Sequence, residues 1–405
     1  MWVVPRTGRR LSTRGNVRTG AERPCGLASL AGVHTGPPPT REPVHVSQLR
    51  TVQVLGGGSA GSSAHVRSLA AGLAARGVRV TVCAPAALER EFDFQGAGAH
   101  FVPVPRRGDP VAVGALRAVC AGADVVHAHG LHAAVRTALA LGGRRAIPLV
   151  VTWHTRAHAE GARGRMLRVL ERRAARAAAV VLGTSSDLVD RARRRGARDA
   201  RLAAVAVPAP RTPVPDGKAR AELGAVDRPL LIAVGSLVEH RGYDVLLDAA
   251  HRWKALDPVP VLAIAGEGRQ RAALQRRIEA EALPVKLLGR RDDVTELLAA
   301  ADAAVLASRW EGRSLLAQEA LRLGVPLVAT AVGGVPELVG DAAELVPYGD
   351  AAALGDAVAR LLADPGRRRE LAEAGLVQAA DWPTEDETVA QVLSVYDELT
   401  QRHGW

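Results

Sequence analysis

SRWEGRSLLAQEALRLG (residues 308–324) follows an apolar run, residues 303–307, that is typical of a buried parallel strand. The pattern predicts a helix over residues 314–323 with Ser314 as its N-cap. Glu311 then lies in the turn between strand and helix, and Glu319 lies more than one turn into the helix. Because the N-terminus of a helix favours an anion such as a phosphate, the stretch predicts a site for a polar, elongated, phosphorylated ligand. A chance pair of glutamates on a helix is the alternative.

The same alternation of strand-like runs and amphipathic helices occupies both halves of the chain, which predicts an α/β fold with two doubly wound parallel sheets. A stretch rich in proline separates the halves and indicates a linker. The predicted division is a disordered basic extension at 1–49, a first Rossmann-like domain at 50–207, a linker at 208–228, a second Rossmann-like domain at 229–382 and a helical segment at 383–405.

Residues 308–324 and the following GVPLVATAVGGVPELV (residues 324–339) resemble the E-x7-E signature of retaining glycosyltransferases of family four. The resemblance covers residues 50–400. It implies the GT-B fold, in which two Rossmann-like domains face a cleft, and a last helix that crosses back to the first domain. It also implies that Glu311 binds hydroxyls of the donor sugar and that Glu319 binds the nucleoside ribose.

The segment VGSLVEHRG (residues 234–242) resembles the family's G-R-L-x-x-x-K-G segment, whose two cations neutralise the donor diphosphate. Arg241 keeps one charge, whereas Ser236 replaces the other. EGRSLL departs from the usual E-G-F-G-L at Arg313 and Ser314. The predicted donor-binding residues are Gly57, Gly58, Gly61, Ser236, Gly266, Glu267, Arg290, Gly312, Arg313, Ser314, Leu315 and Glu319.

Gly56, Gly58 and Gly61 satisfy G-x-G-x-x-G between a strand and a helix, so a dinucleotide site is an alternative. Such a site needs an acid at the end of the next strand to hold a ribose, but residues 82–85 are Val-Cys-Ala-Pro. The turn is therefore expected to face the cleft, as the resemblance implies, or to serve packing alone.

Histidines gather at two predicted strand ends. His127, His129 and His132 form H-x-H-x-x-H, which could ligate a metal or pack behind the site. His154, in the segment TWHT, resembles the family's histidine that points at the donor sugar; a structural histidine is the alternative. We expect His154, Glu311 and Arg241 to be catalytic and expect no metal ligand among the site residues.

The net charge is +11, but aromatic residues make up only 3% of the chain, which argues against nucleic-acid binding by base stacking. The basic helix predicted over residues 163–178 could lie on an anionic membrane, or it could bury a stripe containing Met166, Leu167, Leu170 and Ala174. Three cysteines without C-x-x-C spacing, no spanning run and no apolar signal core favour the cytoplasm, with peripheral contact at the inner membrane face as an option.

The resemblance implies transfer of a hexose or N-acetylhexosamine, with retention, from a nucleotide diphosphate sugar to an acceptor hydroxyl, which could be lipid-linked. No D-x-D occurs, so we expect metal-independent transfer and no cofactor besides the donor. A nucleotide-sugar epimerase of the same fold and a non-catalytic nucleotide-sugar-binding protein remain alternatives.

Overall fold

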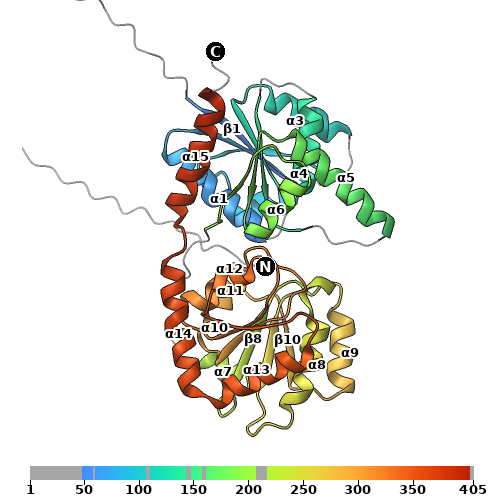
Figure 1. Cartoon of the computed structure of the whole chain (residues 1–405), viewed down its shortest axis with the longest axis vertical. Coiled ribbons are helices and arrows are strands. Elements are labelled where there is room, and N and C mark those ends of the chain that lie inside the picture. Colours follow the sequence, from blue (N-terminus) through green and yellow to red (C-terminus); the bar gives the residue numbers. More distant parts are fainter. Residues whose placement is uncertain are drawn as a thin grey trace, which may run out of the picture.

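Two α/β domains lie one above the other in the computed structural model, which describes residues 48–57, 60–105, 110–142, 147–156, 161–206 and 217–401 (Figure 1). The predicted extension lies outside these residues except for its last two positions, and the prolines of the predicted linker and Gly58 lie outside them as well. Among the described residues, no helix is long and apolar enough to cross a bilayer.

The first domain contains a parallel sheet of seven strands in the order β3-β2-β1-β4-β5-β6-β7. Its central strands are apolar runs that are buried along almost their whole length, which is typical of a sheet covered on both faces. Its elements are β1 (Arg50–Leu55), α1 (Ala60–Ala75), β2 (Arg79–Ala84), α2 (Ala86–Phe92), β3 (His100–Pro103), α3 (Pro110–Cys120), β4 (Val125–His129), α4 (Leu131–Leu141), β5 (Leu149–Trp153), α5 (Gly161–Ala177), β6 (Val180–Gly183), α6 (Ser186–Arg194) and β7 (Ala200–Leu202).

The second domain contains a parallel sheet of six strands in the order β10-β9-β8-β11-β12-β13. Its elements are α7 (Lys218–Leu223), β8 (Leu230–Val234), η1 (Glu239–Arg241), α8 (Tyr243–Trp253), β9 (Val261–Ala265), α9 (Arg271–Ala280), β10 (Val285–Gly289), α10 (Val294–Ala299), β11 (Ala303–Leu306), α11 (Leu315–Arg322), β12 (Leu327–Thr330), α12 (Val335–Val339), β13 (Glu344–Val346), α13 (Ala351–Ala363) and α14 (Pro365–Ala380). The predicted pair of doubly wound parallel sheets is therefore confirmed.

Strand order reverses between β1 and β4 in the first sheet and between β8 and β11 in the second. Ligands of doubly wound sheets bind outside the carboxyl ends of the strands at such points. The loops that follow these four strands are therefore where a site is expected.

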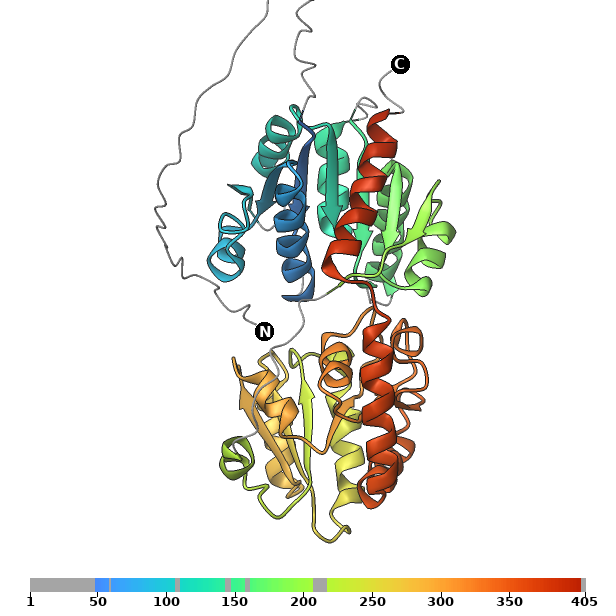
Figure 2. The same cartoon turned by 90° about the vertical axis from the view of Figure 1, so that its left-hand side faces the viewer.

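The last helix, α15 (Glu385–Gln401), belongs spatially to the first domain (Figures 1 and 2). Its apolar face packs in the same core cluster as α1, and a Cβ on Gly72 of α1 would lie only 2.5 Å from a methyl of Val389. Arg201 of β7 pairs with Glu398 of α15 at 2.8 Å. Helices α14 and α15 thus run from one domain to the other (Figure 2).

The loop after β11 docks on the first domain. Trp310 is 6% exposed, packs in the first domain's core and donates from its indole N–H to Asp187 at 2.9 Å. Glu337 of α12 accepts from the backbone N–H of Ser186, at the N-terminus of α6, at 2.9 Å. A Cβ on Gly312 would lie 2.6 Å from the carbonyl oxygen of His154. These contacts hold the two domains close together.

Two details differ from the sequence predictions. The described part of the predicted linker, residues 217–228, includes α7, whose Leu223 packs in the core of the second domain. On α5, the predicted buried stripe is wrong at Met166, which is 57% exposed, because the buried face runs instead through Gly164, Glu171 and Ala174. Periodicity alone does not show which face of a helix meets its domain.

Candidate active site

A cavity of about 680 Å³ lies between the two domains, outside the carboxyl ends of the strands. The first domain contributes α1, the loop after β5 and the segments that follow β6 and β7. The second domain contributes the loops after β8, β9, β10 and β11 together with the start of α11. The lining residues are Gly61, Ser62, His154, Thr155, Thr184, Val205, Val234, Gly235, Ser236, Arg241, Glu267, Arg290, Glu311, Gly312, Arg313, Ser314, Leu315, Leu316 and Gln318.

The cavity brings together most of the residues singled out from the sequence. All three predicted catalytic residues line it, and so do eight of the predicted donor-binding residues: Gly61, Ser236, Glu267, Arg290, Gly312, Arg313, Ser314 and Leu315. Gly57, Gly266 and Glu319 are not among the lining residues. Thr184 and Gln318, which line the cavity, carried no sequence signal.

Gly266 has a packing role. Its φ is +150°, and a Cβ at this position would lie 1.9 Å from the carbonyl oxygen of Gly235. The turns after β8 and β9 can approach this closely only because a glycine stands there.

The two helix N-termini at the cavity face each other. Gly61 in the first turn of α1 would place a Cβ 3.2 Å from the side chain of Leu315, the first residue of α11. Ser314 is the N-cap of α11, as predicted, since its hydroxyl accepts from the N–H of Ala317 at 3.4 Å. The positive ends of both helix dipoles therefore point toward the cleft.

Glu311 is held by two donors. Arg241 forms an ion pair with its carboxylate, and the hydroxyl of Ser308 donates to the same oxygen at 2.7 Å. The Glu311 side chain is 11% exposed and that of Arg241 24% exposed. Gly242, with φ +69°, holds the turn of Arg241 against the end of β11, where a Cβ would lie 2.0 Å from the carbonyl oxygen of Ala307. The turn that carries Arg241 is thus packed tightly against the end of β11, next to the loop that carries Glu311.

Glu319 lies on α11, outside the set of residues that line the cavity. Its Oε2 has no hydrogen-bond partner among the described residues. Burial raises the pKa of the Glu319 carboxyl to about 8, and the nearby charge of Arg322 offsets part of the rise. The carboxyl is therefore largely protonated at neutral pH.

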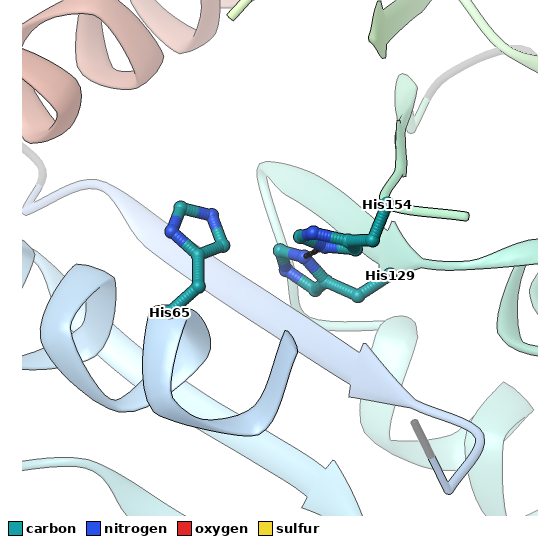
Figure 3. A group of neighbouring side chains, drawn as sticks. All are labelled: His65, His129 and His154. Atoms are coloured by element: carbon teal, nitrogen blue, oxygen red, sulfur yellow. Dashed lines mark hydrogen bonds between the residues drawn. The ribbon is translucent and has the colours of Figure 1, made fainter. Parts of the chain in front are cut away.

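Three histidines from different elements lie close together: His65 from α1, His129 from the end of β4 and His154 from the segment after β5 (Figure 3). Of the three, His154 lines the cavity. His129 Nδ1 lies 3.3 Å from His154 Nε2. The His65 ring stands at an angle to the other two, with centroid separations of 5.7 and 5.4 Å. Burial lowers the pKa of all three imidazoles, that of His65 to about 4, so all three are neutral at pH 7.

A chain of hydrogen bonds continues from His129 to α15. His129 Nε2 contacts Gln53 Oε1 at 3.0 Å, and Gln53 Nε2 donates to the Tyr396 hydroxyl at 3.0 Å. The hydroxyl contacts His127 Nδ1 at 2.6 Å, and His127 Nε2 contacts Thr152 Oγ1 at 2.6 Å. Because an amide oxygen only accepts, His129 carries its proton on Nε2 and presents a bare Nδ1 to His154.

These contacts do not support the metal-binding alternative for H-x-H-x-x-H and agree with packing behind the site for His127. Both ring nitrogens of His127 are engaged in hydrogen bonds, and His132 is exposed on α4. Only His129 of that triad belongs to the cluster at the cavity. The sequence gives no signal for three residues of this network, His65, Gln53 and Tyr396, because they match no motif and lie far apart in the chain.

Comparison with known proteins identifies the two halves. Residues 60–208 match the family described as glycosyl transferase 4-like domain, and residues 216–377 match glycosyl transferases group 1. The chain is 32% identical over 312 residues to a D-inositol 3-phosphate glycosyltransferase of Xylanimonas cellulosilytica. This match covers 69% of this chain and 73% of the relative.

A second relative is similar over a shorter stretch. The chain is 36% identical over 188 residues to a GDP-mannose-dependent monoacylated alpha-(1-6)-phosphatidylinositol monomannoside mannosyltransferase of Corynebacterium glutamicum. That match covers 44% of this chain and 49% of the relative, so it spans only about half of the relative's length.

The fold recurs in the crystal structure of Anabaena HepE in complex with UDP-glucose, with a TM-score of 0.73 and 20% identity over 86% of this chain and all of the other. This likeness shows the architecture. The chain therefore belongs to the glycosyltransferases of the family-four type, and its two parallel-sheet domains form the GT-B fold.

Proposed function

We propose that this protein transfers a hexose or N-acetylhexosamine from a nucleotide diphosphate sugar to an acceptor hydroxyl, with retention of configuration and without a metal ion. The observation that carries the proposal is the ion pair of Arg241 and Glu311 on the wall of the interdomain cavity. The pair supports the proposal because a guanidinium suited to a diphosphate lies directly beside a carboxylate suited to sugar hydroxyls. The relatives reported above are named as sugar transferases, and none of them as an epimerase.

Departure of the nucleoside diphosphate leaves an oxocarbenium-like carbon and a growing negative charge on the leaving group, which the site must stabilise. Arg241 supplies a positive charge from η1, in the loop after β8, and the N-terminus of α11 supplies free N–H groups. Arg290 lines the same cavity and adds a second cation near the base side, in a pocket where Ser236 replaces the expected arginine.

Glu311 accepts hydrogen bonds from the sugar hydroxyls in this proposal, and its orientation is set by Arg241 and Ser308. His154 approaches the sugar from the first domain. Its neutral imidazole donates or accepts a hydrogen bond without placing a positive charge next to the developing oxocarbenium centre. Glu319 keeps its assignment to the ribose, which requires the donor to reach the unpaired Oε2 at the second turn of α11.

Nucleotide release from a panel of UDP-, GDP- and ADP-sugars, with cell extract as acceptor source and with or without EDTA, tests the proposal. We expect acceptor-dependent release from one donor class that persists in EDTA, and a product whose anomeric proton has the coupling of the donor. Interconversion of donor sugars without an acceptor would show an epimerase. Binding of donors without release under any condition would show a non-catalytic protein.

We further propose that α5 contacts an anionic membrane and places a lipid-linked acceptor near the cleft. Met166 and Val169 are 57% and 52% exposed among exposed arginines such as Arg165 and Arg168, a combination suited to an acidic interface. The Corynebacterium relative is named for a phosphatidylinositol mannoside substrate.

Vesicle sedimentation tests the contact. We expect binding to vesicles containing phosphatidylglycerol, little binding to pure phosphatidylcholine, and loss of binding in Met166→Ser/Val169→Ser. Leu376→Ser/Val377→Ser on α14, which removes two exposed apolar side chains of the second domain, is the matched control. Equal binding by both double variants would contradict the role of α5.

A further inference from the structure

Three buried or half-buried imidazoles of the first domain lie close enough together to be considered as ligands of one metal ion. One ring nitrogen from each of His65, His129 and His154 lies within 4.8 Å of the other two (Figure 3). The 3.3 Å between His129 Nδ1 and His154 Nε2 matches the spacing of two nitrogen ligands around tetrahedral Zn²⁺, about 3.3 Å for Zn–N bonds of 2.0–2.1 Å. The hydrogen bond between these two rings therefore holds the nitrogens at the separation that two zinc ligands need.

The surroundings orient one ligand in advance. Metal-binding histidines usually donate their other N–H to an oxygen that fixes the tautomer and the ring. His129 does so, because its Nε2 contacts Gln53 Oε1 at 3.0 Å, and Gln53 is itself held by the Tyr396 hydroxyl at 3.0 Å. The bare Nδ1 of His129 faces His154 and needs a proton or a cation between the two rings.

We propose that His65, His129 and His154 bind a divalent transition-metal ion, Zn²⁺ above all, and that the bound ion inhibits the enzyme. Three imidazole nitrogens select zinc-like ions over Mg²⁺ or Ca²⁺, which prefer oxygen. His65 and His129 are 3% and 4% exposed, so the ion enters from the side of His154, which lines the cavity. His65 supplies the third nitrogen, and a fourth position is left for water, as in zinc sites with three protein ligands.

Inhibition follows from the place of the ion and rests on the proposed function. His154 must face the donor sugar for transfer, but as a ligand it is turned to the metal, whose positive charge would also stand beside an oxocarbenium-like centre. Zinc and donor therefore compete for one region of the cavity. This predicts a transferase that needs no metal and that a chelator activates when zinc is present.

Co²⁺ titration of the tag-free full-length protein tests metal binding without any activity measurement. We expect one equivalent of Co²⁺ to give the intense visible absorption of a tetrahedral site, and Zn²⁺ to displace it. In His65→Ala and in His154→Ala, we expect zinc affinity, measured by competition with a chromophoric chelator, to fall by about 100-fold. His132→Ala removes an exposed histidine and is the control with native affinity.

The site is overturned if no such absorption forms, or if all three variants bind zinc as the native protein does. Far-ultraviolet circular dichroism checks folding, and His154→Ala, at the cavity wall, decides the matter if the more buried His65→Ala does not fold. The inhibition is tested separately, by nucleotide release with added Zn²⁺ and then EDTA. Cobalt absorption with unchanged release under zinc refutes inhibition, whereas cobalt absorption without release in any condition refutes the proposed transfer.

Discussion

Arg241 and Glu311 form an ion pair that joins the loops after β8 and β11, the two strands at which the order of the second sheet reverses. The pair is mostly shielded from water and is completed by Ser308. Its two charges are therefore fixed before a ligand arrives, which reduces the reorganisation needed when charge develops during transfer.

Arg241→Ala removes the cation and leaves the Glu311 carboxylate without its partner. We expect nucleotide release to fall by about 10²–10³-fold, as for loss of one preorganised stabilising donor. Arg241→Lys keeps the charge and should recover part of the rate. Arg252→Ala, which breaks an ion pair with Asp356 whose side chains are about half exposed, is the control and should leave the rate unchanged. Equal rates in Arg241→Ala and Arg252→Ala would remove Arg241 from the mechanism.

Glu319 makes stability depend on pH. Its carboxyl has a pKa of about 8 in the folded protein against an ordinary value of 4.5, so between these values the folded state keeps a proton that the unfolded chain releases. The free energy of unfolding therefore falls as the pH rises from about 4.5 to about 8. Glu319→Gln abolishes this loss, and we expect a Tm several degrees above the native value at pH 9 but close to it at pH 5.

Differential scanning calorimetry across this range checks the prediction. Glu373→Gln, at an exposed position of α14, should follow the native protein at every pH. A Glu319→Gln variant whose Tm runs parallel to the native curve would show that the folded protein holds no extra proton at this carboxyl.

Trp310 keeps the domains together through its packing in the first domain and its bond to Asp187. Trp310→Ala should weaken this contact by about 3–5 kcal/mol, as for truncation of a buried aromatic side chain. We expect a larger radius of gyration in solution X-ray scattering and nucleotide release lower by about 10²-fold, because reacting groups are misplaced. Trp310→Phe keeps an aromatic ring and should stay compact; an unchanged radius in Trp310→Ala would contradict a docking role.

Tyr396→Phe removes the hydroxyl that connects Gln53 to His127. The loss leaves buried polar partners unsatisfied, so we expect the free energy of unfolding to fall by about 1–3 kcal/mol. Chemical denaturation measures the change. Tyr348→Phe, whose side chain is 40% exposed, is the matched control and should unfold like the native protein.

Much of the fold could be predicted because both sheets are buried on both faces, so strands such as residues 303–307 stand out as short apolar runs. The N-cap at Ser314 could also be predicted, since a serine just before a helix commonly accepts a hydrogen bond from a free N–H of the first turn. The ends of these apolar runs are also visible in the sequence, so cavity residues that follow them, such as His154 and Glu311, could be singled out.

The remaining features depend on packing that no local pattern records. His65 and His129 come from a helix and a strand, and only the fold brings them to His154. Met166 lies on an apolar stripe, yet α5 turns a different face to its domain. The predicted linker, residues 208–228, ends too late, because α7 lies within its described part and Leu223 of that helix packs in the core of the second domain.

The return of α15 to the first domain has a consequence for synthesis. Five buried residues of α15, Val389, Val392, Val395, Tyr396 and Leu399, complete a core whose other buried members lie before residue 204. During translation, the first domain leaves the ribosome early. The apolar surface that α15 covers stays exposed to solvent until the second domain and residues 385–401 have been synthesised. We therefore expect the second domain to mature first, against the usual order from the N-terminus, and a nascent chain stopped before α15 to recruit chaperones.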